Sequence, residues 1–75
     1  MKTITGSQDL GKVIREERKE QGLTQEQLAG LTGVGARFVG ELEAGKDSCQ
    51  LGRALQVAAA LGLSLSVGSR QETAR

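Results

Sequence analysis

The residues of this sequence that could do chemistry are cationic and amide side chains around two short predicted helices. An arginine such as Arg37 can donate two hydrogen bonds to O6 and N7 of guanine. A lysine such as Lys46 can neutralise a phosphate. Gln25 stands at the start of one helix, where its amide can reach a phosphate or a base edge and the helix dipole favours an anion. These residue types suit recognition of a charged polymer better than catalysis.

Missing residue types exclude most other chemistry. The sequence has no histidine, and one cysteine with two aspartates cannot form a zinc cluster. It contains neither a Gly-x-x-x-x-Gly-Lys phosphate loop nor a Gly-x-Ser-x-Gly nucleophile turn. Phe38 is the only aromatic residue, which argues against surfaces that stack the bases of single strands. We therefore expect no enzyme activity, no metal site and no cofactor.

The length of 75 residues, 37% of them hydrophobic, is enough for one small domain. Domains of this size bury little surface, so self-association is expected to help stability. Ten basic residues nearly balance nine acidic ones. No apolar run could span a membrane, residues 1–11 do not resemble a secretion signal, and Cys49 cannot form an internal disulfide. These features favour a cytoplasmic protein.

The hydrophobic spacing and the capping residues predict four helices. Their expected ranges are 8–21, 25–32, 35–44 and 49–61. Polar residues suited to N-caps precede three of them, namely Ser7, Thr24 and Ser48, and Thr24 forms a capping box with Gln27. Glycines follow the ends, at positions 22, 33, 45 and 62. The expected core comprises Leu10, Val13, Ile14, Leu28, Ala29, Leu31, Val34, Val39, Leu42, Leu51, Ala54, Leu55, Ala58 and Leu61, with Phe38 half exposed.

Residues 63–67, Leu-Ser-Leu-Ser-Val, alternate strictly and predict a β-strand. A lone strand in a helical chain must pair with a second copy of itself, pair with residues 2–5, or fray. We favour pairing across a homodimer, which would bury Leu63, Leu65 and Val67 on one face. The expected organisation is an N-terminal arm at 1–7, a domain at 8–67 and a disordered tail at 68–75.

The second and third predicted helices, joined by a short turn at Gly33, have the spacing of a helix-turn-helix. In that motif the second helix enters the DNA major groove. Gly35, Ala36 and Gly40 are small, and we expect them on the face opposite Val39 and Leu42. A glycine inside a helix costs roughly 1 kcal/mol relative to alanine, so a plain structural helix would not favour Gly40.

The stretch LTQEQLAGLTGVGARFVGELEAGK resembles the lambda-repressor-like (Xre/Cro-type) helix-turn-helix family. The matching residues are Thr24-Gln25, Leu28-Ala29, Gly33-Val34 and Glu43-Ala44-Gly45-Lys46. The segment from Ala36 to Val67 is most similar to HipB-type antitoxins. The resemblance implies an all-α, four-helix fold with a C-terminal strand that pairs across a dimer. It also implies a HipA-type serine/threonine kinase toxin as partner.

The resemblance and the residue chemistry together nominate a set of contacts. Arg18 and Glu43 correspond to a buried ion pair of the resembling repressors, and Arg18 is also a candidate phosphate contact. Glu41 can accept from cytosine or hold Arg37 in place, and the second role is favoured. The candidate DNA-binding residues are Gln25, Ala36, Arg37, Gly40, Glu41, Lys46 and Arg18.

The sequence thus predicts a homodimeric repressor that binds a palindromic operator in double-stranded DNA and regulates its own antitoxin operon. The alternative is a protein-binding module that neutralises a toxin without significant DNA binding. Net charge favours that alternative, because residues 24–47 carry two basic and four acidic side chains, a balance of −2. DNA affinity depends mostly on neutralised phosphates.

Overall fold

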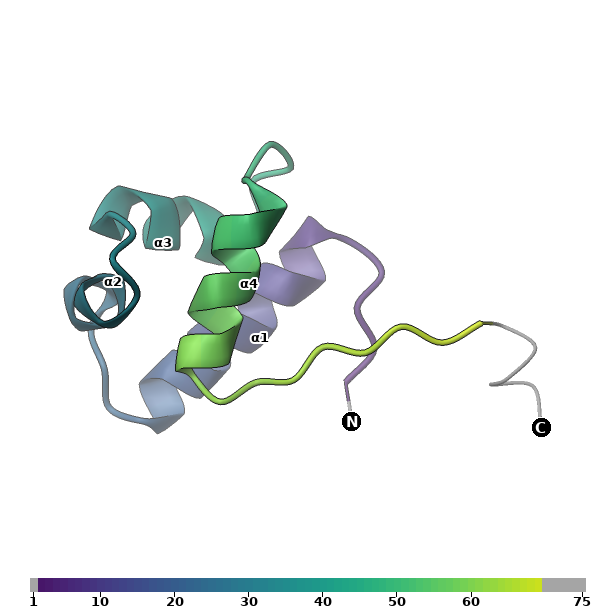
Figure 1. The fold of residues 1–75 in the computed structure, drawn as a ribbon, viewed down its shortest axis with the longest axis horizontal. Coiled ribbons are helices and arrows are strands. Elements are labelled where there is room, and N and C mark those ends of the chain that lie inside the picture. Colours follow the sequence, from purple (N-terminus) through teal and green to yellow (C-terminus); the bar gives the residue numbers. More distant parts are fainter. Residues whose placement is uncertain (1, 70–75) are drawn as a thin grey trace.

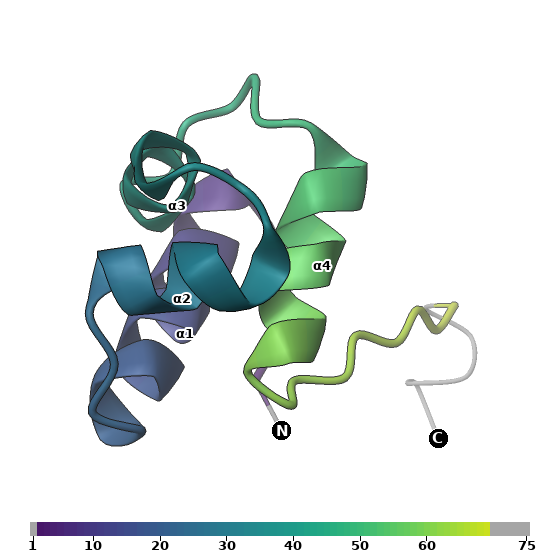
Figure 2. The ribbon, with the colours of Figure 1, turned by 60° about the vertical axis from the view of Figure 1, so that its left-hand side comes forward.

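The computed structural model describes residues 2–69 and contains four helices in that range. They are α1 (Ser7–Glu20), α2 (Gln25–Thr32), α3 (Ala36–Glu43) and α4 (Leu51–Ala60). The all-α prediction is confirmed, and each boundary lies within two residues of the expected one. Figures 1 and 2 show α2 and α3 crossing, since one is seen end-on where the other lies in the plane of view.

One core joins the four helices. Its largest fully buried side chains are Ile14 of α1, Leu28 of α2, Val39 of α3 and Val57 of α4. Helix α3 packs on both α1 and α2, and α2 also packs on α4. Gln21, just after α1, donates from Nε2 to the carbonyl oxygen of Leu61 (2.8 Å) and so ties the ends of α1 and α4 together.

Two expected caps and several expected core residues are wrong. Gly6 occupies the N-cap of α1, and the Ser7 hydroxyl instead lies 3.0 Å from the Gly45 carbonyl oxygen and 2.6 Å from Asp47 Oδ1. Gln50, not Ser48, precedes α4. Leu31, Leu51 and Leu55 are exposed, because each lies at the edge of its helix's buried stripe, and Leu10 and Val13 are half-buried.

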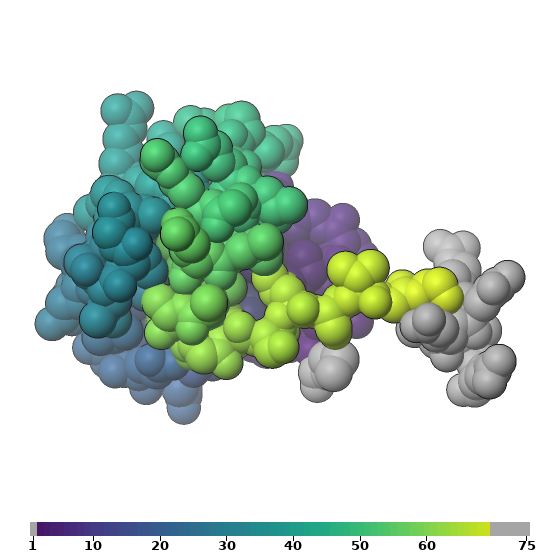
Figure 3. Space-filling view, viewed as in Figure 1, coloured from purple at the N-terminus to yellow at the C-terminus, as the bar shows by residue number. Residues whose placement is uncertain are grey.

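Residues 63–67 do not form a strand within the described chain. The segment instead runs beside the N-terminal residues, and Figure 3 shows it extending from the helical body. Leu63, Ser64 and Leu65 line a groove together with Lys2 and Ile4, without backbone pairing between the two segments. A single copy does not test pairing across a dimer. The predicted tail at 68–75 falls mostly on residues outside 2–69.

Helices α1 and α3 approach so closely that only glycine fits at one contact. A Cβ atom at Gly11 would lie 2.3 Å from the carbonyl oxygen of Leu42 and 2.8 Å from that of Glu43. Gly45 makes a second close approach, since its φ is +84° and a Cβ there would lie 2.6 Å from Gln8 Cγ. The end of α3 is therefore held against the first turns of α1 by backbone contact.

We predict that Gly11→Ala destabilises the fold by about 1–3 kcal/mol, because the new methyl group must push two backbone carbonyls away. Gly30→Ala is the matched control, since a Cβ there would meet nothing within 4 Å. It should stabilise the protein by up to about 1 kcal/mol through helix propensity. Urea unfolding midpoints measure both changes. Equal shifts in the two variants would contradict the close α1–α3 contact.

Candidate nucleic-acid interface

Helices α2 and α3 form a short bihelical unit whose ends are fixed by local chemistry. Thr24 Oγ1 accepts from the backbone N–H of Gln27 (3.0 Å), and Gln27 Oε1 accepts from the N–H of Thr24 (2.8 Å). This is the predicted capping box. Gly33 ends α2 in the left-handed region, at φ +76°. Because glycine adopts that conformation without strain, the chain turns sharply into α3.

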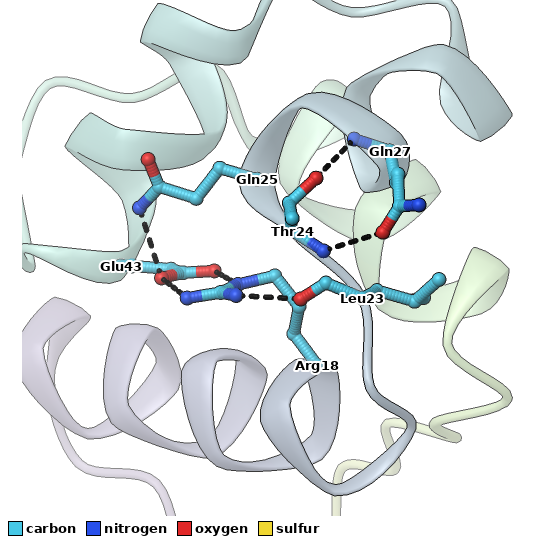
Figure 4. A network of polar contacts seen from close by, with 6 residues as sticks. All are labelled: Arg18, Leu23, Thr24, Gln25, Gln27 and Glu43. Carbon is cyan, nitrogen blue, oxygen red and sulfur yellow. Dashed lines mark hydrogen bonds and ion pairs between the residues drawn. The ribbon is translucent and has the colours of Figure 1, made fainter.

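A nearly buried ion pair anchors the far end of α3 (Figure 4). Arg18 Nε lies 2.6 Å from Glu43 Oε2, and its Nη2 donates to Glu43 Oε1 (3.0 Å). Arg18 Nη1 donates to the carbonyl oxygen of Leu23 (2.7 Å). The two charged side chains are only 10% and 3% exposed. The hydrogen bond to Glu43 raises the pKa of Arg18. It joins α1, α3 and the loop before α2.

Gln25 belongs to the same network. Its Nε2 donates to Glu43 Oε1 (3.1 Å), as Figure 4 shows. A Cβ at Gly40 would lie 3.5 Å from Gln25 Oε1, an ordinary van der Waals distance, so the amide packs over Gly40 without requiring glycine there. The surrounding recess has a volume of about 240 Å³ and is lined by Arg15, Arg18, Gln25, Gly40, Glu43 and Ala44. It is a polar depression where α1, α2 and α3 meet.

The outward face of α3 carries charge. The Arg37 side chain is 91% exposed, and its Nε lies 3.5 Å from Glu41 Oε2. Lys46 Nζ lies 3.2 Å from the same oxygen. The hydrogen bond from Lys46, with a smaller contribution from Arg37, lowers the pKa of Glu41. Both cations and the carboxylate therefore lie together on the outer side of α3 and of the turn that follows it.

Of the three small residues expected on the open face of α3, only one is fully exposed. Ala36 is half-buried and packs against the core, since it lies on the flank of the stripe formed by Val39 and Leu42. Gly40 is half-buried because the Gln25 side chain crosses it. Gly35 is exposed, as expected. The exposed face of α3 is thus formed by Arg37 and the half-exposed Glu41 rather than by small residues alone.

Sequence reasoning missed three features of this site. The Gln25–Glu43 hydrogen bond crosses between helices, and the Lys46–Glu41 contact spans the α3 end at a spacing of five residues. Arg15 lines the recess, and no spacing rule separates it from Lys12 or Lys19 on α1.

Within residues 2–69, no group of side chains could hold a metal ion, and none of the helices has the length and apolar character needed to span a bilayer.

Comparisons with known proteins show which other chains resemble this one. A protein-family model described as Helix-turn-helix matches residues 14–67. The "Uncharacterized HTH-type transcriptional regulator y4mF" of Sinorhizobium fredii (strain NBRC 101917 / NGR234) is 48% identical over 66 residues, covering 88% of this chain and 87% of that protein. An "Uncharacterized HTH-type transcriptional regulator" of Methanothermobacter thermautotrophicus is 50% identical over 50 residues, covering 67% and 72%.

Solved structures share the fold. The "HipB-O4 20mer complex" and the "Structure of HipA-HipB-O2-O3 complex" each match with a TM-score of 0.85 and 21% identity. Each match covers 93% of this chain and 99% of the other. The four-helix arrangement is therefore the one found in HipB.

We predict that Glu43→Ala costs about 3–5 kcal/mol of folding stability, because it leaves the Arg18 guanidinium buried without its charge partner. Lys2→Ala is the control, since it removes an ion pair to Glu16 whose side chains are 62% and 51% exposed. That pair is screened by solvent and its loss should have little effect. Urea denaturation measures both. A Glu43→Ala variant as stable as Lys2→Ala would contradict the anchoring role.

Proposed function

This chain belongs to the Helix-turn-helix family, and from that membership we propose that it is a sequence-specific, double-stranded DNA-binding transcriptional repressor. The observation that carries the proposal is the bihelical unit with Arg37 projecting fully into solvent from α3. In this motif the second helix lies in the major groove and the first crosses the backbone. Helix α3 is anchored by its inner face and leaves its outer face open.

The proposed contacts divide into positioning and reading groups. Gln25, at the start of α2, and Lys46, after α3, would contact phosphates, and Arg15 at the rim of the recess would join them. Arg37 would read guanine through its paired donors. Gly40 lies beneath the Gln25 side chain, and half-buried Ala36 would contribute through its exposed part. Arg18 is committed to Glu43 and Leu23, so its role is to hold α3.

We propose that the protein acts as a homodimer. Leu65 and Val67 are exposed and Leu63 is half-buried, so a second copy pairing along residues 63–67 would cover apolar surface and satisfy backbone groups. A two-fold dimer requires a palindromic operator with half-sites about 34 Å apart or a multiple of that distance. Binding would occlude the promoter, and the protein would act in the cytoplasm.

The finer proposal is that this repressor is the antitoxin of a HipA-type kinase and regulates its own operon. Support comes from the shared fold with HipB over nearly the whole chain. One of the similar structures contains HipA together with HipB. Residues 63–69 lie away from α3 in Figures 1 and 2, so a toxin bound on that side of the dimer would leave α3 accessible.

The second candidate is a module that only neutralises a toxin. The acidic bias of residues 24–47 favours it. The structure weakens that argument, because Glu43 is neutralised by Arg18 and does not face outward. Counting the remaining outward charges, Arg37 and Lys46 oppose Glu26, Glu41 and Asp47, a balance of −1 rather than −2.

A DNA fragment from immediately upstream of the gene tests the proposal directly. Fluorescence anisotropy should give tighter binding to this fragment than to random DNA of equal length, weakening steeply as salt rises. The fragment should also be tested with the product of the neighbouring reading frame present. Absence of binding under both conditions would contradict repression and support the toxin-binding module.

We predict that Arg37→Ala weakens operator binding by about 1–3 kcal/mol and relaxes the preference at one base pair. Lys19→Ala is the matched control, because it removes the same charge from an exposed position at the far end of α1. Lys19→Ala should weaken DNA binding less than Arg37→Ala does, and by the same factor for every DNA sequence. Competition with single-base-pair variants of the operator measures both. Unchanged operator affinity in Arg37→Ala would contradict its reading role.

We predict that Leu65→Lys converts the dimer to a monomer at micromolar concentration, because it places a charge within the expected pairing face. Ser66→Lys is the control, since alternate residues of a strand face opposite sides and Ser66 would face outward. Light scattering gives the mass of each variant. If Leu65→Lys keeps the dimer mass, the residues at 63–67 do not join the subunits.

A further inference from the structure

Glu41 touches both of the cations that flank the exposed face of α3. Its Oε2 atom lies 3.2 Å from Lys46 Nζ and 3.5 Å from Arg37 Nε. The Glu41 side chain is 32% exposed, against 48% for Lys46 and 91% for Arg37. A single carboxylate oxygen therefore bridges the cation within the helix and the cation just beyond its end.

This bridge competes with phosphate. Any DNA presents phosphates to the outward face, and each cation that neutralises one releases counterions and adds affinity regardless of sequence. Lys46 is a compact charge already paired with Glu41, so a phosphate must displace that carboxylate to engage it fully. Because Lys46 and Arg37 lower the pKa of Glu41, its carboxylate is ionised at neutral pH and also repels the phosphates of DNA.

The effect on Arg37 differs from the effect on Lys46. The carboxylate meets Arg37 at Nε, on the stem side of the guanidinium. The Arg37 side chain is 91% exposed, so its two terminal nitrogens lie in solvent. The terminal edge, which supplies parallel donors to guanine O6 and N7, stays available while Glu41 restrains the stem. A base edge can therefore recruit Arg37 without breaking the bridge.

We propose that Glu41 is a specificity-determining residue: it withholds Lys46 from phosphates of any sequence while holding the stem of Arg37 in place for a base edge. The inference rests on the proposed DNA-binding function and deepens it. Glu41 touches the contact residues rather than the DNA, so it is a positioning residue. Its removal should increase binding to random DNA more than binding to the operator.

The test compares the wild-type protein with Glu41→Gln on the upstream fragment and on random DNA. Each cation freed to neutralise a phosphate is worth about eightfold in random-DNA affinity at 0.1 M salt. We expect the preference for the operator over random DNA to fall by about that factor. The slope of log affinity against log salt on random DNA should steepen by about one.

Glu26→Gln is the matched control. Glu26 is exposed in the first turn of α2 and carries the same charge, but within residues 2–69 the ion-pair partner of Arg37 and Lys46 is Glu41 rather than Glu26. It should raise affinity for both DNAs alike and leave their ratio unchanged. If Glu41→Gln and Glu26→Gln behave identically, the effect is one of net charge and the proposal is overturned.

A measurement without DNA separates this proposal from the proposed function. In the free protein, Lys46→Met should raise the pKa of Glu41 toward its ordinary value, as followed by carboxyl-carbon NMR. An unchanged pKa would overturn the bridge even if the wild-type protein binds its operator. Conversely, a wild-type protein that does not distinguish the upstream fragment from random DNA contradicts the proposed function, and the specificity role with it.

Discussion

The ion pair between Arg18 and Glu43 is the contact on which the recognition surface depends. One guanidinium uses three nitrogens on three acceptor oxygens, two from the last residue of α3 and one from the loop that leads into α2. The same carboxylate then accepts from Gln25 at the start of α2. Because three helices meet at two charged side chains, the orientation of α3 relative to α1 and α2 is defined by a few directional bonds as well as by the small apolar core.

Close backbone contact completes this arrangement. Among residues 2–69, nine hydrophobic residues are buried, four of them large and completely enclosed, which is a small core to fix four helices. Gly11 and Gly45 compensate by letting α1 lie directly against the end of α3. The Ser7 hydroxyl, which does not cap α1, instead satisfies acceptors in the loop after α3. The residues that hold the end of the proposed reading helix therefore come largely from α1.

Local chemistry predicted most of the fold, and long-range contacts account for what it did not predict. The Thr24–Gln27 capping box and the terminal Gly33 depend on neighbours in sequence, so their pattern was sufficient. Leu51 and Leu55 follow the same apolar spacing as truly buried residues, and only the packing of α4 shows that they are exposed. Gly40 is a related case: it is half-buried because the Gln25 side chain from another helix lies over it. The Glu41–Lys46 contact needed the turn after α3, which no periodicity describes.

The run of chain from Gly62 to Ser69 leaves the helical body on the side away from α3, next to the N-terminal residues (Figures 1 and 2). The exposed side chains of Leu65 and Val67 give this segment an apolar surface, whereas the outer face of α3 is charged. A dimer joined along this segment would therefore keep both copies of α3 uncovered. Subunit pairing and DNA binding would then use separate surfaces of the same small molecule.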